Sequence, residues 1–534
     1  MDNNMVIIKD SLGEKVKEVD LTSFDIQKKS LLEKISYIKS NITVEPVVAG
    51  LIIPSVISRF AMGNFNLDKA CKVNKKFGDE ICESLIKKEA GNYSDYEQQV
   101  QELISSIDIW KGVIHMALPC IIIIFLGAWS DRTGKRKICI LMPIFGEILT
   151  AVNNLVNVYF FYEIPVHVTI FLETFFTAIT GSFVTLYLGV FSYISDITTE
   201  DTRTFRVGLV NICMTTGLPV GIALGGILVQ RMGYYGVFSL TSFMFIAVFM
   251  YGCFYLKEPA EILKQQDKAP VARDKTEVTS FFNTKHIAET VRVAYKRREG
   301  NARADVILVL FVTFVLFGPN ASEHGIMYLF MRNRLNWDIV KFSIYSSYSI
   351  ILHTIGTLFS ITVFSKRLQF PDSLLCLISC SSKFVGSIWI AFVKTDLEMY
   401  LVPVVEILNA TTFTSLRSMV SKLVEKEEIA RANSMFSLVE TIASLIFHPL
   451  YSWLYMVTLY TLPGAVFLFS AAMVVPAAVV LIGTMRRPAE RARRRGRRPM
   501  NFIYRVFLVR HKKEFHSRKE GDGRAEVEKT KDPK

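Results

Sequence analysis

The sequence has little charge for its length. Only 21% of its 534 residues are Asp, Glu, Lys or Arg, whereas 51% are hydrophobic, and the mean hydropathy is +0.31. This shortage of charge excludes a string of soluble domains and an intrinsically disordered chain. Eight cysteines are too few for a disulfide-dense scaffold, and 29 glycines are too few for collagen.

Several functional motifs are also missing. There is no G-x-x-x-x-G-K-[ST] motif of nucleotide-binding P-loops, which argues against an ATP-driven pump. Residues 1–42 are polar and charge-balanced, so no cleavable signal peptide is predicted. Cys376 and Cys380 share a helical face, but no His or acid completes a metal site with them. We therefore expect no metal, no cofactor and no enzymatic activity.

What the chain does contain is a series of long apolar stretches. A helix needs about 20 such residues to cross a bilayer, and continuous runs without alternation argue against a membrane β-barrel. The sequence predicts an all-α integral membrane protein with twelve transmembrane helices in two six-helix bundles, 43–256 and 304–484. The predicted spans are 43–63, 110–129, 138–161, 166–195, 207–230, 234–256, 304–326, 341–364, 373–393, 400–420, 435–457 and 463–484.

Basic residues in the short loops predict the orientation. With the N-terminus inside, the inner loops hold eleven Lys and Arg and the short outer loops hold five. The long loop 64–109 has nine acidic and six basic residues, and is placed outside. The protein is thus predicted to be N-in/C-in, with 1–42 and 257–303 in the cytoplasm. Plasma membrane and endolysosomal membrane both fit, because this loop would face extracellular fluid or lumen.

The net charge of +13 is concentrated in the tail. Residues 485–534 hold 18 Lys and Arg against 7 Asp and Glu, with eight Arg in 486–498. Attraction to anionic inner-leaflet lipid, a sorting signal and topological anchoring are three interpretations, of which we favour lipid attraction with anchoring. A nucleic-acid partner is not expected for such a chain, and we expect a monomer.

The loop 64–109 carries two features of an oxidising compartment. Cys71 and Cys82 lie eleven residues apart, and we favour a local disulfide over free or otherwise paired thiols. Asn92 begins an N-x-S glycosylation sequon. Both predictions depend on the loop facing outward.

Two glycine-containing motifs lie on the predicted helices. Residues 127–137 match G-x-x-x-D-R-x-G-R-[KR], the signature of the major facilitator superfamily, and 365–372 resembles a degenerate second copy. The fifth span resembles the antiporter-associated glycine and proline motif of that superfamily, although tight packing explains it equally well. The predicted gating residues are Gly127, Asp131, Arg132, Gly134 and Arg136, and the predicted packing or hinge residues are Gly217, Pro219, Gly221 and Gly225.

Further strings begin at Thr43, Leu126, Arg203, Lys257 and Leu416, and together they resemble the proton-coupled folate transporter family, solute carrier family 46. The string that begins at Leu67 resembles arthropod members of this family. The resemblance implies a secondary transporter that couples an organic solute to protons, and it assigns anion binding and proton coupling to Arg417. Asn211 and Ser182 replace two acids of the folate carrier, which weakens folate as the substrate.

Ionisable residues inside predicted spans are functional candidates. We expect Arg417 and Glu406 to bind substrate, since eleven residues of continuous helix would place them on one face. Lys383 is predicted either to form a salt bridge or to contact substrate. The proton-coupling candidates are Glu147, Glu173, Glu406, Glu440, His324 and His353.

The predicted function is alternating-access transport of a small organic anion, coupled to protons as a symport. The alternatives are efflux of drugs or organic ions by antiport, and a membrane receptor or scaffold that transports nothing.

Overall fold

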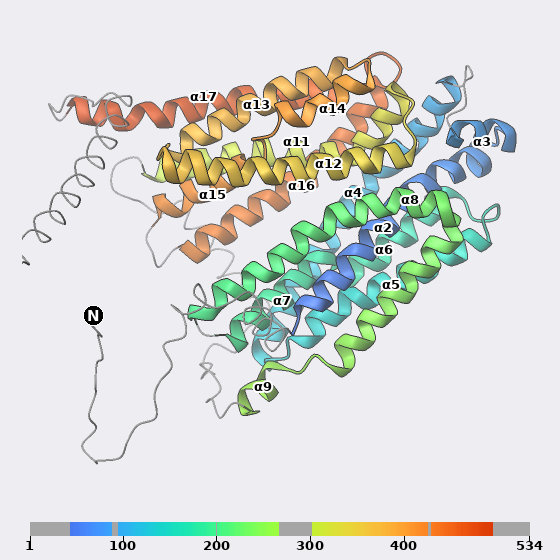
Figure 1. Ribbon diagram of the computed structural model, residues 1–534, viewed down its shortest axis with the longest axis horizontal. Coiled ribbons are helices and arrows are strands. Elements are labelled where there is room, and N and C mark those ends of the chain that lie inside the picture. The colour runs from blue at the N-terminus through green and yellow to red at the C-terminus, as the bar shows by residue number, and fades with distance from the viewer. Residues whose placement is uncertain (1–42, 88–93, 199, 266–301, 425–428, 495–534) are drawn as a thin grey trace, which may run out of the picture.

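The computed structural model describes residues 43–87, 94–198, 200–265, 302–424 and 429–494, and every regular element among them is helical. The helices form two bundles lying side by side (Figure 1). The N-terminal bundle contains α2 (Glu45–Lys69), η1 (Ala70–Lys75), α3 (Asp79–Lys87), α4 (Ser94–Thr133), α5 (Lys137–Tyr159), α6 (Val166–Ile179), α7 (Ser182–Ile197), α8 (Glu200–Phe254) and α9 (Pro259–Gln265). The C-terminal bundle contains α11 (Ala302–Arg334), α12 (Ile339–Phe359), η3 (Ser360–Arg367), α13 (Asp372–Phe392), α14 (Asp396–Val405), α15 (Thr411–Leu423), α16 (Ile429–Thr458) and α17 (Ala465–Arg494).

Nine helical segments of the described chain are long and apolar enough to cross a membrane. One of them, Arg206–Phe254, has 49 residues and covers two predicted spans. It is interrupted at Gly233, whose φ of 66° suits glycine because a Cβ would crowd the backbone there. Large apolar side chains on the outside, such as Phe243 and Val479, fit a lipid environment. The protein is an integral membrane protein, and the count of twelve and the N-in/C-in orientation stay predictions that agree with this fold.

The segment 64–109 differs from the expected loop, because most of its described residues are helical. α2 runs on to Lys69, η1 and α3 follow, and α4 already begins at Ser94. The reason is that these helices pack against the rest of the protein and do not extend into solvent as a free loop would. Val100 and Ile104 of α4 lie buried in the same apolar cluster as Phe330 of α11.

Two predicted spans, 166–195 and 400–420, are broken near their middle. The first divides into α6 and α7 at Gly181, which has a φ of 84°. The second divides into α14 and α15 across the turn 406–410. Non-helical backbone at membrane depth occurs where it is buried in protein or lines a cavity. The two breaks occupy corresponding positions in the two bundles, since each lies in the fourth predicted span of its half.

The buried apolar residues are shared by the bundles at only one end. The cluster at the end with α3 joins both bundles, through residues such as Leu67 and Val100 on one side and Phe330 and Trp337 on the other. At the opposite end each bundle has its own cluster, one around Ile140 and Leu186 and another around Val312 and Leu416. Accordingly, the ribbons diverge toward the end with α9 and α15 (Figure 1).

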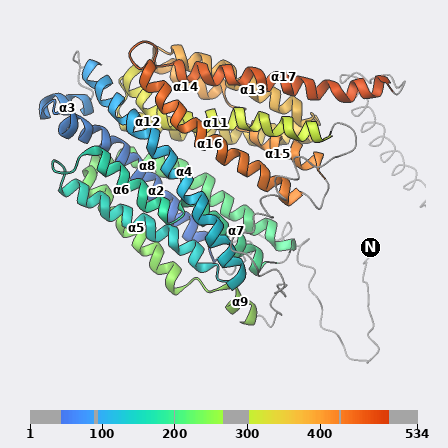
Figure 2. The ribbon, with the colours of Figure 1, turned by 180° about the vertical axis from the view of Figure 1, so that it is seen from behind.

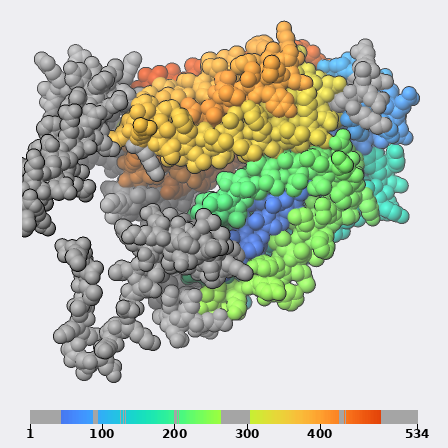
Figure 3. Space-filling model, in the orientation of Figure 1, coloured from blue at the N-terminus to red at the C-terminus, as the bar shows by residue number. Residues whose placement is uncertain are grey.

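Two helix pairs form the most extensive contacts between the bundles. α8 lies along α12, where Ser347 Oγ donates to the carbonyl of Pro219 at 2.9 Å. The surfaces of these two helices touch in the space-filling view (Figure 3). α4 lies along α16 on the other side (Figure 2), where Gly112 is close to His448. With the predicted orientation, the bundles share their buried apolar residues at the outer end and diverge toward the cytoplasmic end, which we call the open end.

Candidate functional site

Lys383 on α13 is the centre of a buried charge cluster in the C-terminal bundle. Its Nζ lies 2.6 Å from Glu323 Oε2 on α11 and 3.2 Å from Glu406 Oε1. All three side chains are at most 10% exposed. Two carboxylates around one ammonium leave one negative charge uncompensated if all three groups are ionised, and burial makes that charge costly. We call Glu323, Lys383 and Glu406 the lysine cluster.

Glu406 lies where the helix is broken, not on the Arg417 face that the sequence predicted. The turn 406–410 separates α14 from α15, so the eleven-residue spacing no longer follows helical periodicity. The Glu406 side chain instead packs over Gly386, where a Cβ would clash with it. The expectation that Glu406 and Arg417 share a face was therefore wrong, because it assumed a continuous helix.

Arg417 on α15 pairs with another acid. Its guanidinium donates to Glu440 Oε2 of α16 at 2.9 Å and lies 4.9 Å from the ring centre of Phe436. The Arg417 side chain is 49% exposed. Arg417 is therefore an accessible cation closer to the open end than the lysine cluster.

The N-terminal bundle also holds charges at membrane depth, but they are more loosely paired. Lys111 Nζ of α4 lies 3.9 Å from Glu173 Oε2 of α6. Glu147 on α5 lies within electrostatic range of both Glu173 and Arg59 of α2. Arg59 is exposed, and its guanidinium lies over the ring of Phe183 at 4.8 Å.

Two of the predicted histidines lie around the lysine cluster. His324 follows Glu323 on α11, and His353 is on α12; both are within electrostatic range of Lys383. Among the described residues, nothing forms a hydrogen bond with the buried Nε2 of His353. The structure thus brings His324, His353 and Glu406 together, while Glu440 lies beside Arg417 and the other two acids lie in the facing bundle.

A buried ion pair joins the two bundles at the end predicted to face outward. Arg332 Nε of α11 donates to Glu97 Oε1 of α4 at 2.6 Å, and the two side chains are 3% and 5% exposed. Arg332 also donates to Asn64 Oδ1 on α2 and to the carbonyl of Leu85 on α3. We call the Glu97–Arg332 pair the outer lock, because the bundles cannot separate here without exposing both charges.

The opposite end contains the predicted gating loop between α4 and α5. Gly134 adopts a φ of 69° and closes the turn with a hydrogen bond to the carbonyl of Ser130. Gly127 leaves room for Leu188 of α7, which a Cβ would meet at 3.2 Å. The side chains of Asp131 and Arg132 lie outside the described residues.

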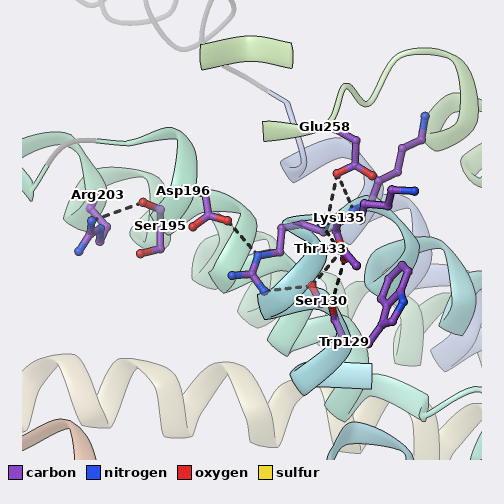
Figure 4. A network of polar contacts seen from close by, with 10 residues as sticks. Trp129, Ser130, Thr133, Lys135, Ser195, Asp196, Arg203 and Glu258 are labelled. Atoms are coloured by element: carbon purple, nitrogen blue, oxygen red, sulfur yellow. Dashed lines mark hydrogen bonds and ion pairs between the residues drawn. The ribbon is translucent and has the colours of Figure 1, made fainter. Parts of the chain in front are cut away.

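Arg136 connects this loop to its own bundle. Figure 4 shows Asp196 and Glu258 close to the loop residues Ser130, Thr133 and Lys135. Its Nε donates to Asp196 of α7 at 2.9 Å. Glu258, which follows α8, accepts hydrogen bonds from the backbone N–H groups of Arg136 and Lys137, at 3.0 and 3.3 Å, and so caps α5. These contacts of the loop brace the N-terminal bundle internally and do not reach the C-terminal bundle.

The predicted second copy of the motif, 365–372, forms the corresponding turn of the other bundle. Gln369 has a φ of 53° where Gly134 has its positive φ, and Asp372 begins α13 as Lys137 begins α5. Asp372 accepts from Ser418 and Lys422 of α15, at 2.9 and 2.6 Å. Each bundle is thus braced at its inner end by one such turn.

Sequence comparison identifies this architecture. The profile of the Major Facilitator Superfamily matches residues 100–447. The chain belongs to this superfamily. It is therefore a membrane transporter, not an enzyme.

Curated relatives confirm the predicted resemblance to solute carrier family 46. The lysosomal proton-coupled steroid conjugate and bile acid symporter of Gallus gallus is 26% identical, over 71% of this chain and 79% of that protein. The proton-coupled folate transporter of Rattus norvegicus is 25% identical, over 73% and 80%. A probable peptidoglycan muropeptide transporter of Drosophila melanogaster is 22% identical, over 83% and 85%.

Solved structures confirm the fold of this superfamily member. A peptide transporter of the POT type in complex with sulfate aligns with a TM-score of 0.55 and 12% identity, over 83% of this chain and 95% of that one. The inward-open xylose transporter XylE of E. coli aligns with a TM-score of 0.52 and 14% identity, over 84% and 96%.

The glycine motif of the superfamily member packs α8 against α2 inside one bundle. A Cβ at Gly217 would meet Ile52 at 3.0 Å, one at Gly221 would meet Val56 at 2.9 Å, and one at Gly225 would meet Phe60 at 3.0 Å. Pro219 is the exception, since its carbonyl faces α12 of the other bundle. The stripe allows close helix packing and gives no support to antiport.

Cys71 and Cys82 lie at disulfide-bonding distance, with their Cα atoms 5.8 Å apart. The pair connects η1 to α3, and α3 presents the Leu85 carbonyl to Arg332. The cysteine pair is therefore connected to the outer lock through α3, which carries both Cys82 and Leu85. Asn92 lies outside the described residues.

Sequence reasoning missed four charged residues of this transporter. Glu323 lies near the end of a predicted span, and Arg59 lies near the end of the first predicted span. Glu97 and Arg332 were assigned to outer loops. The available signal was charge embedded in apolar sequence, which Arg59 and Glu323 satisfy, whereas the pairing of Glu97 with Arg332 joins residues 235 positions apart.

Proposed function

We propose that the protein is a proton-coupled symporter that moves a small organic anion by alternating access. The observation that carries this proposal is the lysine cluster, a buried set of charges at a helix break in the middle of a transporter bundle. Intramembrane ionisable groups are costly and are retained for transport or coupling. Broken helices at the midplane are a general feature of substrate and ion sites in secondary transporters.

The proposed substrate class follows from the relatives and from the accessible cations. The relatives are named for bile acids, steroid conjugates, folate and a muropeptide. The first three are organic anions, and Arg417 offers a half-exposed guanidinium toward the open end. Folate itself is disfavoured, because Asn211 and Ser182 replace two acids of the folate carrier.

We assign proton transfer to the lysine cluster and its histidines. Glu406 has Lys383 as its ion-pair partner and lies beside the turn that interrupts the helix. Adding a proton to either carboxyl makes the cluster neutral overall, which lowers the cost of closing the bundle around it. Proton binding and bundle movement are then linked through one buried group.

We further propose three features of the protein's surroundings. The tail 485–534 is attracted to anionic lipid, the transporter is a monomer, and Asn92 is glycosylated. The membrane is the plasma membrane or an endolysosomal one. The Arg side chains of the tail lie outside the described residues, so vesicle binding with and without anionic lipid is the direct test.

Uptake into proteoliposomes tests the proposed coupling. Purified full-length protein is reconstituted, and uptake of taurocholate, folate and a muramyl peptide is measured with and without an inward proton gradient. We expect gradient-driven accumulation of at least one anion, and expect Glu406→Gln to lose accumulation while retaining exchange at equal pH.

Glu398→Gln is the matched control, because Glu398 is a half-exposed acid that caps α14 at the end far from Glu406. Accumulation that ignores the gradient in the wild-type protein would exclude symport with protons. Unchanged accumulation in Glu406→Gln would move the coupling site elsewhere.

A further inference from the structure

Arg59 stands apart from the other arginines of the described spans. It lies on α2, about 20 Å along the helix from Glu45. Only Arg59 and Gly63 are exposed on this helix, and the rest of α2 is buried or half-buried. Since the two are four residues apart, they form one short exposed stripe on an otherwise packed helix.

This stripe faces the interior of the transporter, not lipid. Arg59 lies within electrostatic range of Lys111 and His115 on α4, of Glu147 on α5 and of Tyr187 on α7. Its guanidinium contacts the ring of Phe183 on α7. A lipid-facing side chain would not be surrounded by polar groups from three other helices, so the exposed side of Arg59 lies on the inner surface of the N-terminal bundle.

Arg59 also has no carboxylate within ion-pair distance among the described residues, in contrast to three other arginines at helix contacts. Arg206 pairs with Glu45, Arg332 with Glu97, and Arg417 with Glu440. Lys111 and His115 add cationic or polar groups beside Arg59. Glu173 pairs with Lys111, whereas Glu147 lies within electrostatic range of Arg59 without forming an ion pair with it. An accessible guanidinium in such a setting is ready to bind an anion.

An aromatic ladder continues from the Phe183 ring along α7. Phe183, Tyr187 and Phe191 follow at helical spacing, with ring centres 6.2 and 6.4 Å apart, and all three are half-buried. The opposite face of α7 packs tightly on α5, where Gly189 meets Cys139. The ladder therefore presents apolar, partly exposed area next to the charge of Arg59.

We propose that Arg59 binds the anionic group of the transported solute, while Phe183 and Tyr187 pack against its apolar or aromatic body. The inference rests on the proposed function and identifies the N-terminal half of its substrate site. Arg417 then faces the solute from the C-terminal bundle. A solute held between the two bundles can draw them together, as alternating access requires.

Binding and transport are measured separately to test this assignment. Taurocholate, folate and a muramyl peptide are added to the detergent-purified full-length protein, and the rise in melting temperature reports binding. Exchange at equal pH in proteoliposomes gives KM and maximal rate. We expect Arg59→Gln to abolish the melting shift and to raise KM about tenfold or more, with partial recovery in Arg59→Lys.

Arg231→Gln is the control, because Arg231 is an exposed arginine of α8, two residues before the interruption at Gly233. A melting shift and KM in Arg59→Gln equal to those of the wild-type protein would overturn the assignment. So would the absence of any shift in the wild-type protein with all three anions. A wild-type shift without gradient-driven accumulation would leave Arg59 as the anion site and remove only the symport mechanism.

Discussion

The two bundles hold their central charges in different ways. In the C-terminal bundle, Lys383 lies between two carboxylates at 2.6 and 3.2 Å, in a site that is nearly closed to solvent. In the N-terminal bundle, Lys111 lies 3.9 Å from Glu173, and Arg59 is exposed beside an aromatic ring. A closed cluster is suited to holding a proton, because its uncompensated negative charge is costly when buried and one bound proton neutralises it. An open cation is suited to a solute that must enter and leave.

The largest effect is expected when the closed cluster loses its cation. Lys383→Met leaves Glu323 and Glu406 buried and facing each other without a partner. Breaking a buried pair in this way costs about 3–5 kcal/mol, and proton binding to the remaining carboxyls offsets part of it. We expect a lower melting temperature in detergent and loss of gradient-driven uptake.

Lys341→Met is the control for this variant, because Lys341 pairs with Asp396 at an exposed site of the same bundle. Equal melting temperatures for the two variants would mean that burial does not distinguish the lysine cluster. The double variant Lys383→Met with Glu406→Gln should recover part of the stability, since it removes one of the unpaired charges.

A smaller effect is expected at the outer lock. This ion pair closes the outer end of the molecule, so that solvent from outside does not reach Arg59 and Lys111. Glu97→Gln leaves Arg332 short of a buried charge partner only while the outer end is closed. Losing this partner costs about 2 kcal/mol or more, so the population shifts toward an outward-open state. Gly63→Cys reports the shift, because Gly63 is exposed beside Arg59 and its Cβ would meet nothing within 4 Å.

Labelling of this cysteine by an impermeant maleimide from outside should be slow with Glu97 and faster with Glu97→Gln. Glu102→Gln is the matched control, since Glu102 also contacts the other bundle, through Tyr460, but at an exposed position. Equal rates in all three backgrounds would show that the lock does not control outer access.

The sequence could predict the features that depend on local composition, but not those that depend on contacts between distant helices. The spans, their division into two halves and the turns at Gly134 and 365–372 follow from local composition, because a bilayer demands long apolar helices and a tight turn demands particular residues. Lys383 and Glu406 could be singled out as charges in apolar stretches. The pairing of Lys383 with Glu323 could not be predicted, because no local pattern links α11 to α13.

The broken tenth span shows why the site prediction failed in part. Residues 400–420 are apolar enough to be taken as one helix, and nothing in their periodicity marks the turn at 406–410. The turn is stabilised from α13, where Ser379 donates to the carbonyl of Asn409 at 3.0 Å. Tertiary contacts therefore decided which side chain Glu406 would face, and they placed it with Lys383 instead of Arg417.

The smallest effect is expected at the exposed pair of the C-terminal bundle, and it separates pairing from burial. Asp396 accepts hydrogen bonds from Trp337 Nε1, at 2.6 Å, and from Lys341 Nζ. Burial alone would raise the pKa of the Asp396 carboxyl, but these hydrogen bonds outweigh it and hold that pKa below its usual range. The carboxylate thus stabilises the folded state above its ordinary pKa of about 4, and this contribution is lost as the pH falls through the lowered value.

Asp396→Asn should therefore cost no more than about 1 kcal/mol at pH 7, because the side chain is 50% exposed and screened by water. Melting curves of the two proteins should converge as the pH is lowered below about 4. In Lys383→Met the opposite trend is expected, since acid neutralises the two stranded carboxylates and reduces their repulsion. A loss in Asp396→Asn as large as that in Lys383→Met would show that pairing, and not burial, makes the lysine cluster costly to break.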